Sequence, residues 1–300
     1  MLYRPLGHSG MALSTVGLRL SHARLSKNLP LLRKLIVTGL ENGINAYHFD
    51  TCDTAFLTCA AEAFACVDRK LLFVSVNAHE PGQATDADTY ALTPLKERLR
   101  GVIKLTGLQW IDLLYFQTPG SLSLPPDSRH FLDALKASKF LRYLGAIGDV
   151  RTIHELIRTG LYKIIQTDFD IDSSWDKRRS LDDAVNRDMS VIATDFFPAI
   201  YAKASDVVPQ DARRGFFGGK AKNPLAGAGT HAFLHQTADW TPEELCLGYA
   251  LSQANMACVL IDADTPEHLE ALAAVPERHL PPSVPAQIEM ARFNEQVKAG

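Results

Sequence analysis

Short apolar runs alternate with helix-like segments along the whole chain. Eight of these runs are rich in aliphatic and β-branched residues, and each has the length of a strand. Most are followed by a segment with helical spacing, so the pattern predicts parallel strands joined by helices. The eight runs are Ser14–Leu18, Asn45–Asp50, Lys70–Asn77, Trp110–Gln117, Phe140–Ile147, Lys163–Phe169, Met189–Thr194 and Ala257–Ile261.

The segments between the runs carry the signals of amphipathic helices. In Leu29–Leu40 the apolar residues fall at 31, 32, 35, 36 and 40, which places them on one stripe. Two more helices have proline in their first turn, one starting at Thr93 and one following Thr241. Thr241 and Glu244 also have the spacing of a capping box.

Eight strand–helix units predict an α/β fold, a single (β/α)8 TIM barrel over residues 1–300. A doubly wound sheet shows the same alternation, but no run is followed by the glycine fingerprint of a dinucleotide-binding fold. Leu2–Arg4 and Met11–Leu13 flank a glycine-containing turn and predict an N-terminal β-hairpin that caps the lower end of the barrel. A long loop, from about Tyr201 to Asp239, follows the seventh strand.

Composition and charge exclude several classes of protein. Of the 300 residues, 46% are hydrophobic and 22% charged, and the formal net charge is −3. Because both signs are mixed, we expect no nucleic-acid or membrane partner. No run approaches the roughly 20 apolar residues of a spanning helix, and the first residues lack the apolar core of a signal peptide. The expected location is therefore the cytoplasm.

The five cysteines, at 52, 59, 66, 246 and 258, include no CxxC pair. The first three are spaced by seven residues, which on a helix separates neighbours by about 10 Å and is too far for one metal ion. We expect small buried side chains in a reducing compartment.

Polar side chains stand where the predicted strands end. In a (β/α)8 barrel the carboxyl ends of the strands and the loops after them surround the binding site. An acidic, amide-rich mouth of this kind suits an unknown small-molecule ligand. The residues at these positions are Arg19, Asp50, Asp53, Asn77, His79, Glu80, Gln117, Asp149, Gln166, Asp168 and Phe196.

Several motifs are distributed over nearly the whole chain: Tyr3–Gly10, Glu41–Thr51, Trp110–Leu114, Leu141–Ile147, Gln166 with Asp168, Thr241–Leu251 and Thr265–Leu269. In their order and spacing they resemble the motifs of the aldo-keto reductase family. The resemblance implies the barrel, and a hydride transfer from a nicotinamide to a carbonyl in which an Asp, a Tyr, a Lys and a His cooperate.

Three of those four catalytic roles have no matching side chain here. Asp50 matches the aspartate, but Ala55 stands at the tyrosine position, Asn77 at the lysine and Gln117 at the histidine. Alanine has no proton to give, and asparagine carries no charge. Glutamine donates a hydrogen bond without changing its protonation state. The nearest tyrosines, at 47 and 115, lie on predicted strands. Their side chains would point to the wrong side of the sheet or lie too deep in the barrel to replace the missing tyrosine.

The positions that the resemblance assigns to the cofactor are also altered. Arg19 replaces a glycine, and Asp149 belongs to a Gly-Asp pair in place of the Ser-Asn pair that holds the nicotinamide amide. Gln166 remains, and so does the aromatic Phe196, which matches the residue that stacks on the nicotinamide. After the eighth strand, acidic residues 262 and 264 would repel a 2′-phosphate. We therefore expect no cofactor, with NADPH possible but disfavoured.

Other roles for the remaining polar residues stay open. Arg19 could pair with Asp50 and fill part of the cofactor cleft, or extend into solvent. His79 beside Glu80, with Asp50, could perform acid–base chemistry, or His79 could be an exposed loop residue.

The insertion holds four cations between residues 213 and 222 that could cover an anionic ligand, or form a solvated loop. Alternating aspartates at 168, 170 and 172 suggest a hard cation, but this stretch is polar in the family itself and no metal is expected.

These observations favour an aldo-keto-reductase-like pseudoenzyme that binds a small ligand or a protein partner. One alternative is an enzyme with non-redox acid–base chemistry, such as elimination or isomerisation, at the barrel mouth. Another is an NADPH-dependent carbonyl oxidoreductase with a non-standard proton donor.

Overall fold

Eight parallel strands close into a barrel in the computed structural model, which describes residues 1–83, 85–86, 88–203 and 231–299. The order around the barrel is β10-β3-β4-β5-β6-β7-β8-β9. All eight predicted runs are confirmed as barrel strands. The first lies two residues later than expected, because Ser14 belongs to the hairpin. The strands are β3 (Val16–Leu20), β4 (Ala46–Phe49), β5 (Phe73–Asn77), β6 (Ile111–Gln117), β7 (Leu141–Ile147), β8 (Ile164–Asp168), β9 (Ser190–Thr194) and β10 (Met256–Ile261).

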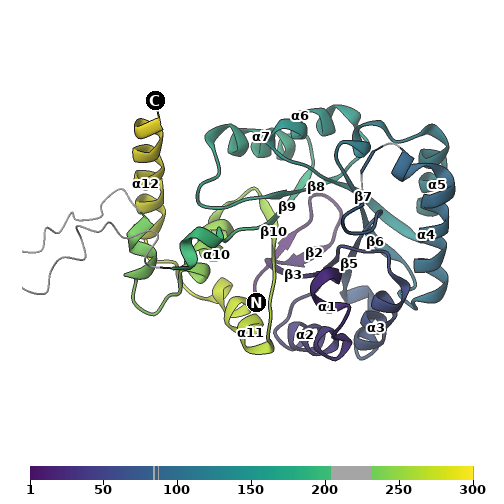
Figure 1. The fold of residues 1–300 in the computed structure, drawn as a ribbon, viewed down its shortest axis with the longest axis horizontal. Helices are drawn as coiled ribbons and strands as arrows, with labels where there is room; N and C mark the ends of the chain where they lie inside the picture. The colour runs from purple at the N-terminus through teal and green to yellow at the C-terminus, as the bar shows by residue number, and fades with distance from the viewer. Residues whose placement is uncertain (84, 87, 204–230, 300) are drawn as a thin grey trace, which may run out of the picture.

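Helices surround the barrel, and the last helix stands at one side of the molecule beside α10 (Figure 1). They are α1 (His22–Leu25), α2 (Leu29–Glu41), α3 (Thr54–Phe64), α4 (Leu92–Leu105), α5 (Pro126–Ala137), α6 (Val150–Thr159), α7 (Trp175–Val185), α10 (Pro242–Ser252), α11 (Pro266–Ala274) and α12 (Ser283–Ala299). The predicted capping box at the start of α10 is confirmed. Short 3₁₀ segments are η1 (Arg69–Leu71), η2 (Asp88–Tyr90), η3 (Gly120–Ser123), η4 (Ala199–Ala202), η5 (His231–His235) and η6 (Val275–Glu277).

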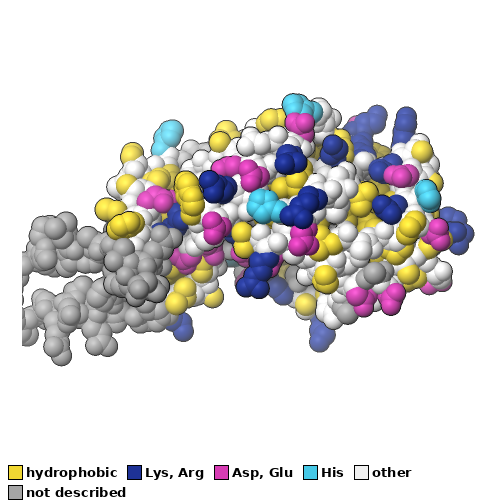
Figure 2. All heavy atoms as spheres, turned by 90° about the horizontal axis from the view of Figure 1, so that it is seen from above, with side chains coloured by type: hydrophobic (Ala, Val, Ile, Leu, Met, Phe, Trp, Pro, Cys, Tyr) yellow, Lys and Arg dark blue, Asp and Glu magenta, His cyan; other side chains and the backbone are white. Residues whose placement is uncertain are grey.

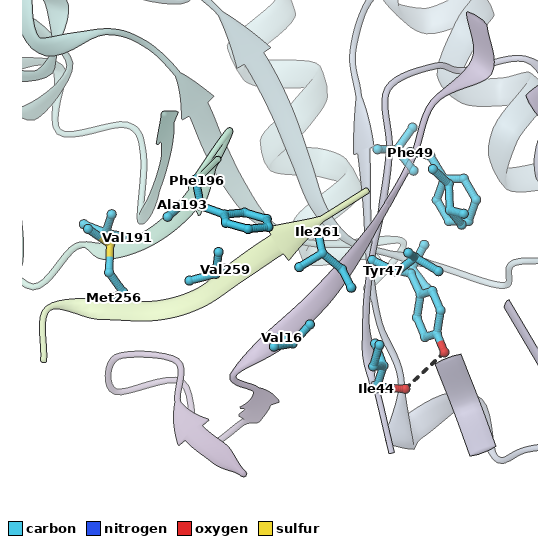
Figure 3. Close-up of a cluster of buried hydrophobic side chains, with 14 of the residues drawn as sticks. Val16, Ile44, Tyr47, Phe49, Val191, Ala193, Phe196, Met256, Val259 and Ile261 are labelled. Carbon is cyan, nitrogen blue, oxygen red and sulfur yellow. Dashed lines mark hydrogen bonds between the residues drawn. The ribbon is translucent and has the colours of Figure 1, made fainter. Parts of the chain in front are cut away.

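Alternate residues of each strand face two different cores. One set packs against the helices, and Figure 3 shows part of it, including Val16, Phe49, Val259 and Ile261. The other set fills the barrel interior and includes Phe73, Leu113, Tyr115 and Ile164. Because the period along a strand is two, this division fixes which residues near the strand ends point into the barrel.

The predicted N-terminal hairpin is confirmed as β1 (Tyr3–Pro5) paired with β2 (Ala12–Ser14). Leu6 and Leu13 are buried and join the interior core of the barrel, so the hairpin closes its lower end. The Asn45 side chain fastens it, accepting from the Ser14 amide at 2.7 Å and donating to the Ala12 carbonyl at 2.9 Å.

A buried carboxylate also fastens the lower end of the barrel wall. Asp112 is fully buried at the start of β6, where it accepts from Arg69 at 2.7 Å and from the Val74 amide at 2.9 Å. Its other oxygen accepts from the Trp110 indole at 3.0 Å and pairs with Arg142 at 2.9 Å. Both guanidinium groups lie over the Trp110 ring. This cluster ties η1, β5, β6 and β7 together.

Four of the five cysteines are buried as expected, and all five are free. The expectation is wrong for Cys66, which is exposed because it lies in the turn after α3. In the part of the chain that is described, no helix is long and apolar enough to cross a membrane. On the face shown in Figure 2, acidic and basic side chains are interspersed. The cations predicted to cover a ligand, between residues 213 and 222, lie outside the described residues.

Candidate functional site

Five of the residues predicted at the mouth share the inward parity of the barrel interior. Asn77 lies four residues after the interior residue Phe73, and Gln117 two after Tyr115. Gln166 lies two residues after Ile164, and Asp50 four after Ala46. Arg19 alternates with Leu18 and Leu20, which face the helices. The structure therefore brings these predicted residues together at the carboxyl ends of the strands.

Arg19 binds two carboxylates across the ends of three strands. Its Nε lies 3.0 and 3.1 Å from the oxygens of Asp262, beyond β10, and its Nη2 lies 2.8 Å from Asp195, beyond β9. Although burial opposes the charge, hydrogen bonds to Asp262 and Asp195 hold the pKa of Arg19 above its ordinary value. The alternative in which Arg19 pairs with Asp50 is wrong, because the guanidinium is hydrogen-bonded to these two acids instead. Neither acid was among the predicted mouth residues, although Asp262 was expected to repel a cofactor phosphate.

Further ion pairs extend this group along the rim. Arg24 pairs with Asp262 at 3.4 Å and also with Asp264, and Lys177 pairs with Asp168. Each of the cationic side chains Arg19, Arg24 and Lys177 on this side of the mouth is therefore paired with at least one carboxylate. Any ligand that used Arg19 or Lys177 would first have to displace a carboxylate.

Asp50 instead caps the short segment that follows β3. Its Oδ1 accepts from the His22 amide at 2.7 Å, and the Ser21 hydroxyl also bonds to its carboxylate. Burial is the largest influence on this half-buried group and raises its pKa, against smaller lowering effects of the hydrogen bonds and of the charges on His22 and Arg19. Among the described residues, no cationic side chain is hydrogen-bonded to Asp50.

Two amide side chains at the mouth have buried oxygens without partners. Asn77 is 6% exposed and Gln166 is 4% exposed. Asn77 Oδ1 and Gln166 Oε1 receive no hydrogen bond from the described residues. Since a buried, unsatisfied acceptor costs about 1–3 kcal/mol, such groups inside a mouth indicate where a donor would bind.

His79 lies in a buried cluster that includes a tyrosine not predicted from the sequence. The Tyr90 hydroxyl lies 3.3 Å from His79 Nδ1 and accepts from the Gln117 amide at 2.9 Å. Burial lowers the pKa of His79, a hydrogen bond to the Gln117 side chain opposes this, and the imidazole is expected to be neutral near pH 7. The exposed-loop interpretation of His79 is therefore wrong. The Glu80 carboxylate has a different partner from His79, since it accepts from the Thr51 hydroxyl at 2.6 Å.

Comparisons with known proteins rest on structure, since no family model and no curated protein matches the chain. A protein described as an aldo-keto reductase from Pseudomonas aeruginosa matches with a TM-score of 0.63 and 16% identity, over 91% of this chain and 93% of its own. The holo form of an aldo-keto reductase from Bacillus halodurans matches with a TM-score of 0.69 and 16% identity, over 97% and 96%. This chain has the fold of the aldo-keto reductases. The predicted fold resemblance is thereby confirmed.

Within this fold, Ala55 lies in the first turn of α3, whose N-terminus Asp53 caps by accepting from the Phe56 amide at 2.7 Å. Ala55 is exposed and lines an outer groove between α2 and α3 that also includes Thr58 and Arg33. It contributes no polar atom to the mouth.

The two tyrosines considered in the sequence analysis, Tyr47 and Tyr115, do not replace the tyrosine of the aldo-keto reductases. The Tyr47 hydroxyl donates to the carbonyl of Ile44 at 3.1 Å, on the helix side of the sheet (Figure 3). Tyr115 is fully buried in the barrel interior and packs edge-on against His48. Its ring lies over Gly145, where a Cβ would come within 2.7 Å of it. Neither hydroxyl is exposed at the mouth.

The residues matched to the cofactor site of the aldo-keto reductases are already engaged. Asp149 is the N-cap of α6 and accepts from the amides of Arg151 and Thr152. Phe196 is 5% exposed and packs in the core between sheet and helices, near Ala193 and Val259 (Figure 3). Gln166 alone keeps an unpartnered polar atom.

The three alternating aspartates, at the end of β8 and just after it, have separate partners. Asp168 pairs with Lys177, Asp170 accepts from Ser173, and Asp172 accepts from the Tyr201 hydroxyl at 2.7 Å. No group of three His, Cys, Asp or Glu side chains in the described ranges could hold a metal ion.

Proposed function

We propose that this chain is a non-reductase barrel whose mouth binds a small polar ligand. The proposal rests on the aldo-keto reductase fold combined with a mouth of amides, carboxylates and paired cations. In place of a titrating set, the catalytic positions hold Ala55, Asn77 and Gln117. The unpartnered oxygens of Asn77 and Gln166 supply acceptors for a ligand.

The observation that carries the proposal concerns the tyrosines beyond the strand ends. Tyr90, after β5, is fully buried and bonded to Gln117 and His79. Tyr201, after β9, is 6% exposed and donates to Asp172. Reduction of a carbonyl requires a proton donor in contact with the substrate oxygen. Neither phenol is exposed to a ligand, so the described mouth supplies no tyrosine for this step.

The described residues do not fit NADPH. Arg19, which the resemblance places beside the cofactor, is held by Asp195 and Asp262 and lies across the ends of β3, β9 and β10. Asp262 and Asp264 bring negative charge to the position of the cofactor phosphate, and Arg24 already pairs with both. Gln166 Oε1 could accept from a nicotinamide amide, but one such bond does not offset these charges.

Incubation of the purified chain with NADPH and a panel of aldehydes and ketones tests the proposal. We expect no NADPH oxidation above the rate in buffer, measured by absorbance at the nicotinamide band. The triple variant Ala55→Tyr, Asn77→Lys, Gln117→His serves as a comparison and should also remain inactive, because Arg19 and its acids are unchanged. Carbonyl-dependent oxidation by the unmodified chain would overturn the proposal.

The buried His79 cluster favours a second candidate, non-redox acid–base chemistry. A neutral imidazole with a lowered pKa can accept a proton near pH 7. The ligand would have to give its proton directly to the imidazole, because the Gln117 side chain that His79 contacts does not change its protonation state. In that case His79→Ala would abolish turnover of the ligand, whereas a binding barrel would keep its ligand affinity within a few-fold.

A further inference from the structure

We propose that a cavity at the lower end of the barrel, beside the N-terminal hairpin, binds a small carboxylate that carries an apolar chain. The cavity measures about 330 Å³ and lies among the hairpin, the end of α10 and η6. Its volume is at the lower end of the range typical of small-molecule pockets. Because the cavity is separate from the mouth, this inference goes beyond the proposed function.

Arg4 brings to the cavity wall a cation that has no carboxylate partner. Its Nη1 donates to the carbonyls of Gln253 at 3.0 Å and Met256 at 2.7 Å, and its Nη2 donates to the carbonyl of Leu251. These carbonyls lie at the C-terminal end of α10 and just beyond it, so they hold the guanidinium in place without removing its formal charge. Among the described residues, no carboxylate is bonded to Arg4.

The bonds of Arg4 leave one edge of its guanidinium open. Nε donates to none of the described residues, and Nη2 makes a single bond although it carries two hydrogens. Nε and Nη2 are neighbours on one edge of the planar group, and this edge can donate to both oxygens of a carboxylate. Burial lowers the pKa of Arg4, against a smaller raising effect of Cys258, which agrees with a cation that lacks an acid.

Thr15 adds to the same lining a hydroxyl without a partner. Its amide donates to the Leu2 carbonyl at 2.9 Å and its carbonyl accepts from the Val259 amide at 2.8 Å, so its backbone groups are satisfied. Its side chain is not, because the residue is 3% exposed and Oγ1 has no hydrogen-bond partner among the described residues. A hydroxyl can donate to a carboxylate oxygen, and such a bond would remove the cost of the unsatisfied group.

The charges around the cavity favour an anion. The charged residues of the lining are Arg4 and Arg278, and no acid in the described ranges belongs to it. Arg278 is already paired with Glu244 at 3.0 Å. Glu277, next to the lining in sequence, pairs with the Met1 ammonium. The uncompensated charge is therefore that of Arg4, which matches a ligand with a single negative charge.

Most of the remaining lining is apolar. Leu251 and Val275 are buried, whereas Leu2 and Tyr3 are exposed, and all four line the cavity. A ligand chain packed against them would cover apolar surface that otherwise faces water. Inorganic phosphate could bind Arg4 but would leave this surface uncovered. A monocarboxylate with a short alkyl chain fits both the charge and the apolar wall.

Calorimetric titration of the purified chain with hexanoate tests the proposal, with 1-hexanol as the neutral comparison and inorganic phosphate as the anion without a chain. We expect saturable binding of hexanoate and at least tenfold weaker binding of the other two. The Nε–H signal of Arg4 should shift in NMR spectra as hexanoate saturates the chain. This signal is assigned by its absence from the Arg4→Lys variant.

Two variants and a control locate the binding. Thr15→Val should weaken hexanoate binding about tenfold, while the unfolding temperature without ligand stays the same or rises, because an unsatisfied buried hydroxyl is removed. Arg4→Lys keeps the charge but has no paired donors, and it should weaken binding at least tenfold. Lys163→Met removes a cation that lines a separate cavity at the same end of the barrel and should leave the affinity unchanged.

Several results would overturn the proposal. They are the absence of saturable hexanoate binding, equal binding of 1-hexanol, preferred binding of phosphate, and an affinity that Thr15→Val leaves unchanged. Loss of binding in Lys163→Met alone would overturn it as well, because the ligand would then occupy the other cavity. The NADPH assay concerns the mouth, so its outcome does not depend on any of these results.

Discussion

The Asp112→Ala variant should lose about 3–5 kcal/mol of unfolding free energy, the effect of leaving a buried charge without its partner. Arg69 is 8% exposed, and the substitution removes its only bonded carboxylate among the described residues. The Val74 amide and the Trp110 indole lose an acceptor as well. Urea unfolding followed by circular dichroism measures the loss.

A surface acid provides the control for this prediction. Asp133→Ala removes an exposed partner of Lys136 and should change stability by no more than about 0.5 kcal/mol. If both variants unfolded at similar urea concentrations, the Asp112 cluster would not fasten the lower barrel wall as described.

The Arg19→Met variant should lose about 1–2 kcal/mol at pH 7, a value reduced because Asp195 is 56% exposed. Methionine fills a similar volume but leaves two acids facing each other. Arg33→Met, which removes an exposed pair with Glu62, is the matched control and should have little effect. Thermal unfolding of both variants checks the difference.

The effect of Arg19 should also depend on pH. Burial raises the pKa of Asp195, but the hydrogen bond and charge of Arg19 outweigh this and leave it below the ordinary value. A lowered folded-state pKa contributes stability above the unfolded-state value, about 4, and that contribution is lost as pH falls through the folded-state pKa. The difference between the native chain and Arg19→Met should therefore shrink below about pH 4. A difference that stays constant down to pH 2 would contradict the role of Asp195.

The barrel and its hairpin could be predicted because burial imposes a period of two on every strand. Each predicted run overlaps the strand observed, and the inward parity of Asn77, Gln117 and Gln166 follows from the same period. The α10 capping box was predictable for a similar reason, since Thr241 and Glu244 interact over three residues. The spacing of residues close together in the sequence is therefore sufficient to predict strands, a hairpin and a helix cap.

Partner choice at the mouth could not be predicted in this way. Arg19 and Asp50 both point inward, yet Arg19 turns toward Asp195 and Asp262, 176 and 243 residues away in sequence. The link from Tyr90 to His79 depends on how the loop after β5 folds, and no spacing signals it. His79 and Glu80 are neighbours in sequence, but they point in different directions and bind different partners.

Calorimetric titration of NADPH into the purified chain tests the central claim most directly. With Arg19 bound to two carboxylates, and with Asp262 and Asp264 at the position that the resemblance assigns to the cofactor phosphate, we expect no saturable heat up to about 1 mM. This limit corresponds to less than about 4 kcal/mol of binding free energy. Saturable binding in the micromolar range, about 8 kcal/mol, would contradict the account and support a working reductase.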